Sequence, residues 1–495
     1  MTANDWIQRG VSLLRAGTAD EKAAAELPAA PPRPAADARP PRTLTERMAA
    51  TLRRHGEALA PRALRKALED MQAVIDPRLS EVEGGRRALA LAQWYETLQP
   101  DEHRDLWLLM CECLAPDARK LQAAREQFEA AQPGSPDYAQ AEVKLRKALL
   151  SPRARLLQRF SMAPDGMRFL IELRAALLPE VKKDRRLLVL DAELEQLFST
   201  WFDVAFLELQ RISWDSPASL IEKLIQYEAV HDIKSWSDVK NRLDERDRRC
   251  YGFFHPRLPG VPLIFVEVAL TGAVSDSITP LLDEQASADA RKADTAIFYS
   301  ISNTQTGLRG VSFGDSLIKR VVQTLTEEFP RLKTFATLSP IPGLRNWLTR
   351  EAPALLQRLP ERQQQALGRL LGAMPPAPAQ LLAALEEAPS LAPQSPLRQW
   401  LLQAAAEYLG RGLRDGQPLD AVARFHLGNG ARVERLNWAA DPSAKGLRQS
   451  WGLMVNYVYD LKRLDKHRAW LAQGRIPVSG ELEGLFLKAA PQAPA

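Results

Sequence analysis

Hydrophobic residues recur at three- and four-residue spacing through most of the first two fifths of the chain. This spacing is typical of amphipathic helices, and the same region lacks the alternation that is typical of strands. The segments that carry it are TERMAATLRRHGEALA (45–60), ALRKALEDMQAVI (63–75), RRALALAQWYETL (86–98), DEHRDLWLLMCECLA (101–115), ARKLQAAREQFEAA (118–131), YAQAEVKLRKALL (138–150) and GMRFLIELRAALL (166–178). The prolines around Gly134 and Pro152 interrupt the pattern. We therefore predict an all-helical domain over residues 43–191.

The second half of the chain has a different pattern. Short apolar runs rich in β-branched and aromatic residues are typical of strands. They are CYGFFHP (250–256), VPLIFVEVAL (261–270), DTAIFYSIS (294–302) and LKTFATLSP (332–340). Helical patterns follow at 344–359 and 398–412, and ARFHLGNGARVERLNW (423–438) is again strand-like around a Gly-Asn-Gly turn. We predict a mixed α/β domain over residues 192–490, and hence an α+β chain.

The beginning of the chain has neither pattern. Proline and alanine dominate residues 1–42, and no apolar spacing repeats there, which is typical of a disordered leader. Mitochondrial presequences are poor in acidic residues, whereas Asp5, Asp20 and Glu21 lie in this one. We therefore interpret residues 1–42 as a disordered leader rather than as a targeting signal.

Composition and charge exclude several broad classes of protein. The chain has 495 residues and a net charge of +5, but its 61 acidic residues are interspersed among 66 basic ones. This argues against nucleic acid binding, which needs a clustered basic surface. No apolar stretch reaches the roughly 18 residues of a membrane helix. Three cysteines are too few for a disulfide framework, so we expect a cytoplasmic protein.

The stretch SNTQTGLRGVSFGDSLIKRVV, which begins at Ser302, contains three glycines and precedes a helical pattern. We predict a strand at 295–300, a glycine loop at 303–314, a helix at 315–329 and a strand at 332–338. Such a loop lets backbone N–H groups and a helix N-terminus approach an anion. It lacks the Gly-Lys-Ser/Thr ending of a nucleotide P-loop and the G-x-G-x-x-G fingerprint. From these residues alone, an anion site and a plain structural turn remain equal alternatives.

Longer segments resemble a known family. RGVSFG (309–314) is similar to the loop that holds the pyrophosphate of coenzyme A in acetyltransferases, with serine in place of its first glycine. HPRLPGVPLIFVEVALTG, AIFYSISNTQTGLRGVSFG, LIKRVVQTLTEEFPRLKTFATLSPIPG, FHLGNGARVERLNW and GLMVNYVYDL closely resemble the malonyl-CoA decarboxylase family, in order across about residues 228–460. The resemblance implies an α-helical domain followed by an acetyltransferase-like (GNAT-like) catalytic domain.

The resemblance also implies a reaction and its partners. The reaction is the conversion of malonyl-CoA to acetyl-CoA and carbon dioxide, and the helical domain is expected to form a homo-oligomer, a dimer or a tetramer. No cofactor or metal is expected, because the thioester itself accepts the electron pair. The chain ends in APQAPA rather than in a Ser-Lys-Leu peroxisomal signal, which together with the leader suggests a bacterial cytoplasmic enzyme.

The family pattern assigns the reacting groups to two positions. FHLGNGA resembles the catalytic segment, so His426 is the expected proton donor. On a strand its imidazole would point opposite to Phe425 and Leu427 and face a cleft. TLSPIPG resembles the segment of the catalytic serine, so Ser339 is the expected second member, bonding the departing carboxylate or relaying a proton. We expect a Ser–His pair rather than an acyl-serine mechanism, because no G-x-S-x-G elbow is present.

The remaining expectations concern groups around this pair. The residues expected to bind the CoA phosphates are Arg309, Gly310, Val311, Ser312, Phe313, Gly314 and Asp315. Asp315 could equally be a helix N-cap. We expect Lys319 and Arg320 to be solvated, Ser300 and Ser302 to be structural, and Asn456, Tyr457 and Tyr459 to support the pocket.

Two other functions stay open. One is a CoA-dependent acyltransferase on the same fold, although we find no acidic cluster to serve as a base for an amine acceptor. The other is a protein without catalytic activity that senses CoA or serves in assembly, in which Ser339 and His426 would have no chemical role.

Overall fold

We describe a computed structural model of the chain that covers residues 58–244, 246–283, 289–311 and 317–487. The predicted leader over residues 1–42 and nearly all of the predicted helix at 45–60 lie outside these described residues. Among the helices of the described ranges, none has the length and apolar character needed to cross a membrane.

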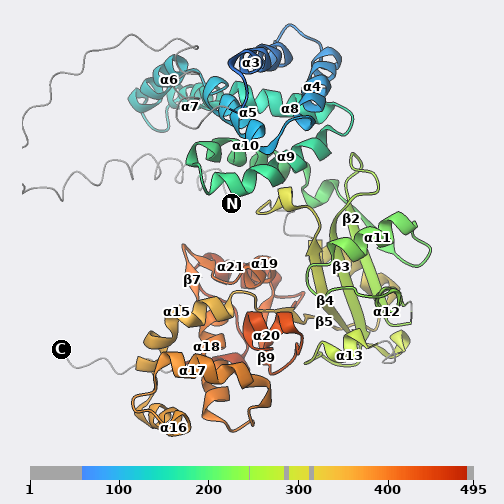
Figure 1. Cartoon of the computed structure of the whole chain (residues 1–495), viewed down its shortest axis with the longest axis vertical. Helices are drawn as coiled ribbons and strands as arrows, with labels where there is room; N and C mark the ends of the chain where they lie inside the picture. Colours follow the sequence, from blue (N-terminus) through green and yellow to red (C-terminus); the bar gives the residue numbers. More distant parts are fainter. Residues whose placement is uncertain (1–57, 245, 284–288, 312–316, 488–495) are drawn as a thin grey trace, which may run out of the picture. The chain divides into compact units, whose positions relative to one another are not determined.

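Helices and their connecting turns make up residues 61–201 (Figure 1). They are α3 (Pro61–Ile75), α4 (Glu81–Glu96), α5 (Pro100–Cys113), α6 (Ala118–Ala130), α7 (Pro136–Leu149), α8 (Pro152–Met162), α9 (Gly166–Val181), the 3-10 turn η1 (Arg185–Leu187) and α10 (Leu188–Trp201). The sequence pattern missed α8 because Pro152 looked like an interruption. In the structure Pro152 is the first residue of α8, where a proline loses no hydrogen bond, and the Ser151 hydroxyl caps the helix.

A mixed sheet of eight strands follows, and its spatial order is β1-β2-β3-β4-β5-β10-β6, with β9 beside β10. The strands are β1 (Glu208–Ile212), β2 (Arg248–Phe254), β3 (Pro262–Thr271), β4 (Thr295–Asn303), β5 (Thr334–Thr337), β6 (Ser339–Pro340), β9 (Arg432–Asn437) and β10 (Met454–Val458). The first four are antiparallel neighbours, and β5 is parallel to β4. Between β4 and β5 the chain passes through the turn η4 (Thr306–Leu308) and the helix α14 (Leu317–Glu328).

This order confirms the predicted α+β fold class. A helical region comes first, and an antiparallel meander, a glycine loop, a helix and a parallel strand follow, as expected for an acetyltransferase-like domain. The strands predicted at 250–256, 261–270 and 294–302 correspond to β2, β3 and β4. The single strand predicted at 332–340 is divided into β5 and β6.

Helices cover both faces of the central strands. On one face, α11 (Ala218–Tyr227) and α12 (Trp236–Arg242) contribute Leu224 and Val239 to a core with Phe265 of β3 (Figure 1). A second core on the same face joins α13 (Thr279–Leu282) to strands β3, β4, β5 and β10. The other face meets α14, whose Glu328 accepts a hydrogen bond from Arg249 of β2 and whose Arg320 lies over the Phe253 ring. Because both faces are covered, β2 and β3 are buried along nearly their whole length and are mostly apolar rather than alternating, with Arg248, Arg249 and Glu267 as buried exceptions.

Shorter elements complete the chain after β6. They are α15 (Leu344–Gln357), α16 (Glu361–Leu371), α17 (Pro378–Ala384), η5 (Leu385–Ser390), α18 (Pro396–Gly410), the hairpin β7 (Leu413–Arg414) and β8 (Gln417–Pro418), α19 (Ala421–Gly428), α20 (Ala444–Ser450), α21 (Leu464–Ala472) and α22 (Gly480–Glu483). The helices predicted at 344–359 and 398–412 correspond to α15 and α18.

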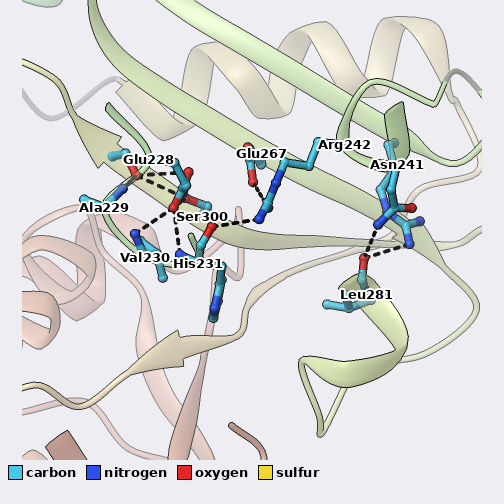
Figure 2. A network of polar contacts seen from close by, with 11 residues as sticks. Glu228, Ala229, Val230, His231, Asn241, Arg242, Glu267, Leu281 and Ser300 are labelled. Atoms are coloured by element: carbon cyan, nitrogen blue, oxygen red, sulfur yellow. Dashed lines mark hydrogen bonds and ion pairs between the residues drawn. The ribbon is translucent and has the colours of Figure 1, made fainter. Parts of the chain in front are cut away.

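A buried polar network connects β3, β4 and the segment between α11 and α12 (Figure 2). Glu267 is fully buried in β3 and accepts a hydrogen bond from Arg242 at 2.7 Å. Arg242 also donates to the His231 carbonyl at 2.7 Å. Glu228 accepts from the Ser300 hydroxyl, at 2.9 and 2.8 Å for its two oxygens, and from two backbone N–H groups at 2.6 and 2.9 Å. These mutual bonds allow charged groups to remain inside an otherwise apolar layer.

We predict that Glu267→Gln lowers the free energy of unfolding by about 3 to 5 kcal/mol, because it leaves the Arg242 guanidinium buried without its counter-charge. Urea unfolding followed by circular dichroism measures this loss. Glu129→Gln is the control, since it breaks an exposed pair with Arg125 of the same 2.7 Å length and should change stability little. A loss for Glu267→Gln no larger than that for Glu129→Gln would contradict the prediction.

Candidate active site

Ser339 lies where the sheet opens next to β4. The Leu338 N–H donates to the Phe298 carbonyl of β4 at 3.0 Å, and one residue later Ser339 pairs with Val455 of β10. We expected Ser339 to end a strand directly before Pro340, but β5 ends at Thr337, and Ser339 and Pro340 form the short strand β6. The Ser339 side chain is buried. Because β4 and β5 are parallel, Ser339 follows β5 at the same edge of the sheet at which the chain leaves β4 toward the glycine loop. Ligands of open α/β sheets bind at such carboxyl-terminal edges.

His426 lies on the helix α19, so the strand predicted at this position is wrong. The Asp420 carboxylate accepts hydrogen bonds at 2.9 and 3.0 Å from the N–H groups of the second and third helical residues, which starts the helix. The buried positions Ala423, His426 and Leu427 then follow helical spacing. The strand-like alternation that we used spans too few residues to decide between the two structures.

The Gly-Asn-Gly turn is placed where the sequence predicts it, but it joins a helix to a strand. Gly430 has φ of 85°, and a Cβ at this position would lie 2.7 Å from the Leu464 carbonyl oxygen. Only glycine fits this combination of conformation and space. The turn connects α19 to β9, which pairs with β10.

The two predicted catalytic residues lie together. The Ser339 Oγ is 3.2 Å from His426 Nε2, and the Ser339 hydroxyl donates to Thr337 Oγ1 at 2.9 Å. On the other side of the ring, His426 Nδ1 is 2.7 Å from the Tyr459 hydroxyl. Since the serine proton is directed to Thr337, all four groups are satisfied when Nε2 carries the histidine proton and Tyr459 donates to Nδ1.

Residues of strand β10 contact both His426 and Thr337. The Tyr457 ring stacks on His426 with centroids 4.7 Å apart, and its backbone N–H donates to Thr337 Oγ1 at 3.1 Å. The Asn456 amide donates to the Thr337 carbonyl at 2.7 Å. Tyr457, Tyr459 and Asn456 thus lie around His426 and Thr337, whereas our sequence analysis missed Thr337. The spacing Thr337-Leu338-Ser339 could have indicated it, because alternate strand residues share a face.

Asp420 connects the segment after Ser339 to the helix of His426. Besides capping α19, its carboxylate accepts from the Gly343 N–H and from the Tyr408 hydroxyl, both at 3.3 Å. A Cβ on Gly343 would lie 2.1 Å from the Tyr408 oxygen, so the contact leaves no space for a side chain. One buried carboxylate therefore relates the positions of Ser339 and His426, which are far apart in the sequence.

Burial determines the protonation of the site. It lowers the pKa of His426 to about 3, and it raises the pKa values of Tyr457 and Tyr459. The free site at neutral pH therefore holds an uncharged imidazole, an uncharged phenol and an uncharged hydroxyl. A buried imidazole of this kind becomes a strong acid once it is protonated.

Only the first part of the glycine loop belongs to the described residues. Arg309 and Gly310 are exposed, Val311 is buried, and Gly310 has φ of 83°. The other expected phosphate ligands lie outside the described residues, namely Ser312, Phe313, Gly314 and Asp315. The expected CoA contacts of this loop remain a prediction.

Two basic residues after the loop have different surroundings. Arg320 is not simply solvated, as the sequence suggested: its guanidinium donates to the carbonyls of Val204 and Leu207 at 2.8 and 2.5 Å. Lys319 is partly exposed and lies 3.9 Å from Asp465. We therefore do not assign the side chains of Arg320 and Lys319 to the site.

Within the ranges that the structure describes, no three His, Cys, Asp or Glu residues gather in a way that could hold a metal ion. The groups gathered around Ser339 are hydroxyl, imidazole, phenol and amide groups. Their chemistry suits proton transfer and hydrogen bonding.

We predict that His426 makes the folded protein sensitive to acid. Its folded pKa of about 3 lies below the unfolded value, so between about pH 4 and 6 the unfolded chain binds one more proton here, and stability falls as pH falls. His426→Asn removes this titrating group. The slope of the unfolding free energy against pH should therefore decrease by about 1.4 kcal/mol per pH unit in that window. Urea unfolding at several pH values measures the slope. An unchanged slope would mean that the imidazole is charged or solvated in the folded chain.

Comparison with known protein families covers most of the chain. Residues 205–494 match the family described as the malonyl-CoA decarboxylase C-terminal domain, and residues 114–202 match the corresponding N-terminal domain. Mitochondrial malonyl-CoA decarboxylase of Rattus norvegicus is 37% identical over 348 residues, which cover 65% of this chain and 68% of the relative. That of Anser anser anser is 35% identical over 410 residues, which cover 76% and 78%.

Solved structures give the same result. The malonyl-CoA decarboxylase of Rhodopseudomonas palustris is 39% identical, with a TM-score of 0.72 over 85% of this chain and 99% of that one. The malonyl-CoA decarboxylase of Cupriavidus metallidurans is 41% identical, with a TM-score of 0.68 over 86% of this chain and 100% of that one. The matched regions include both the helical part and the sheet with Ser339 and His426. The chain belongs to the malonyl-CoA decarboxylase family.

Proposed function

We propose that the protein converts malonyl-CoA to acetyl-CoA and carbon dioxide, and that Ser339 and His426 act at the acyl end of the thioester. The observation that carries this proposal is the buried Ser339–His426–Tyr459 chain of hydrogen bonds at the open edge of the sheet. Membership of the family supports the same reaction. The chain that leads from β4 into the glycine loop leaves the sheet at this edge, and we propose that the loop over 309–315 holds the CoA pyrophosphate.

The reaction needs a group that supplies one proton to carbon. When the bond between the carboxylate carbon and the α-carbon breaks, its electron pair moves into the thioester as an enolate, and the α-carbon then takes a proton. Binding of the malonyl carboxylate next to His426 raises the imidazole pKa, because an adjacent anion favours the charged ring. His426 thus takes up a proton with the substrate. Loss of neutral carbon dioxide leaves this proton next to the enolate.

The neighbouring residues have supporting roles in this scheme. Ser339 is 3.2 Å from Nε2, so its hydroxyl either bonds the departing carboxylate or passes the histidine proton to carbon. Tyr459 holds Nδ1 and keeps the reactive nitrogen directed to Ser339. The thioester accepts the electron pair, so this scheme requires neither a metal nor an organic cofactor.

Two coarser features of the protein are also part of the proposal. We propose that the helical region associates into a homo-oligomer, a dimer or a tetramer, and that the protein acts in the cytoplasm. The vertebrate relatives are named mitochondrial, which describes those proteins. Light scattering on the purified protein tests the first point: a particle mass of two or four times 55.2 kDa is expected, and 55.2 kDa alone would contradict it.

We predict that purified protein mixed with malonyl-CoA alone releases acetyl-CoA and carbon dioxide in equal amounts. Liquid chromatography of the CoA esters and capture of labelled carbon dioxide measure the two products. If turnover requires an amine acceptor, the protein is an acyltransferase. If malonyl-CoA binds without turnover, the protein is a CoA sensor, and the catalytic proposal is wrong.

Three variants connect this activity to the site. His426→Asn should lower kcat about a hundredfold or more with little change in KM, because it removes the proton donor but not the phosphate contacts. Ser339→Ala should have a similar effect, and Tyr459→Phe a smaller one, because it removes only the bond that orients the ring. His103→Asn, in the helical region, is the matched control and should retain activity. Full turnover by His426→Asn would exclude the imidazole from the mechanism.

A further inference from the structure

Arg174, on helix α9, is almost completely buried and bonds the start of the glycine loop. One of its guanidinium nitrogens donates to the carbonyl of Gly307 at 2.8 Å and to that of Arg309 at 2.9 Å. Its Nε donates to Asp191 of α10 at 2.8 Å, and its side chain is 2% exposed. A residue of the N-terminal helical region is therefore bonded to the main chain of a loop that lies more than a hundred residues later in the sequence.

The contact between this helix and the loop is tight. A Cβ on Gly307 would lie 1.9 Å from the carbonyl oxygen of Ile171, which is one turn before Arg174 on α9. Only a residue without a side chain allows this approach. The position of the turn η4 is thus determined by direct backbone contact with α9.

The loop residues that Arg174 holds form a type II turn. Residues 308–311 close with a hydrogen bond of 3.0 Å from the Val311 N–H to the Leu308 carbonyl. Arg309 has φ of −59° and ψ of 129°, and Gly310 has φ of 83°, which are the angles of this turn type. In the alternative type I turn the central peptide is rotated by about half a turn, and glycine permits both arrangements. Arg174 bonds the Arg309 carbonyl in the type II orientation.

This bond determines the direction of the Gly310 N–H group. In a planar trans peptide the carbonyl and the following N–H point in opposite directions. Because the Arg309 carbonyl points to Arg174, the Gly310 N–H points away from the helical region. Gly310 is exposed, and no atom lies within 4 Å of the position of its absent Cβ. An outward backbone N–H in a glycine loop is a typical phosphate donor.

We propose that Arg174 is a positioning residue for the substrate's diphosphate, which it serves by holding the Arg309–Gly310 peptide with the Gly310 N–H directed at the anion. This inference rests on the proposed CoA site of the loop, and it adds a residue from outside the catalytic domain. Arg174 itself does not touch the substrate. Its loss allows the central peptide to rotate and present a carbonyl oxygen to the phosphate.

The test compares two ligands that differ in the phosphates. Arg174→Met should raise the Kd of CoA about tenfold, the expected effect of losing one oriented hydrogen bond to a charged group, and should leave the Kd of pantetheine within about twofold. Isothermal titration calorimetry on the full chain measures both. With malonyl-CoA, KM should rise by the same factor while kcat changes little, because Arg174 is not part of the site around His426.

Two variants make the comparison specific. Arg153→Met is the matched control: Arg153 is also buried, and it bonds Glu193 and the carbonyls of Met110 and Cys111, all within the helical region. It should lower stability without changing the ratio of CoA to pantetheine affinity. Arg174→Lys keeps one donor and the charge, so it should recover part of the CoA affinity. It also replaces Arg174→Met in the test if that variant does not fold.

Three results would overturn the inference. One is unchanged CoA affinity in a folded Arg174 variant, another is an equal loss for CoA and pantetheine, and the third is the same phosphate-specific loss in Arg153→Met. Failure of the proposed function is distinguishable from these outcomes. If the wild-type protein binds CoA but does not decarboxylate malonyl-CoA, the reaction is wrong, and the binding measurements still decide the role of Arg174.

Discussion

The parallel pairing of β4 with β5 is the constraint on which the site depends. It runs from Thr295 opposite Thr334 to Phe298 opposite Thr337, and it ends with the bond from Leu338 to Phe298. Because the strands are parallel, the glycine loop and Ser339 leave the sheet at the same edge. After Leu338 the chain pairs with β10 instead, which brings Tyr457 and Tyr459 next to Ser339. In the proposed function, the thioester end and the phosphate end of the CoA ester both bind at this edge.

Buried carboxylates hold together the parts that the sheet does not pair. Asp420 caps the helix of His426 and also bonds the backbone after Ser339, while Glu228 and Glu267 attach the segment between α11 and α12 to β3 and β4 (Figure 2). Each carboxylate is costly to bury alone and favourable only with its donors in place. These residues therefore contribute to a single arrangement of the site, although none of them carries out the chemistry.

The uncharged state of the free site agrees with the proposed chemistry. A buried histidine that is neutral in the site without substrate has little affinity for a proton until an anion binds beside it. The same burial makes the protonated ring a strong acid once the carboxylate has left as carbon dioxide. In the proposed mechanism, the substrate anion thus favours uptake of the proton by His426, and the burial of the ring favours its delivery. The contact of Arg174 with the loop connects the helical region to the proposed phosphate site.

The class of fold could be read from the sequence, and the family resemblance supplied the expected catalytic pair. Helical spacing located most helices before residue 182, apolar runs located β2, β3 and β4, and the TLSPIPG and FHLGNGA segments pointed to Ser339 and His426. These features depend on local spacing or on a few consecutive residues, so they can be read along the chain. The local structure at His426 was predicted wrongly, because a short segment fits both periods and the N-cap at Asp420 decided for a helix.

Most contacts between distant residues became visible only in the folded chain. The bond of His426 to Tyr459, the role of Thr337 and the contact of Arg174 with the loop all join residues from different elements, whereas the pairing of Ser339 with His426 was already expected from the family resemblance. Such contacts follow from strand order, helix packing and the need of every buried polar group for a partner. The spacing of residues along a single chain does not specify these three conditions. The contacts that depend on them could therefore not be predicted from the sequence pattern.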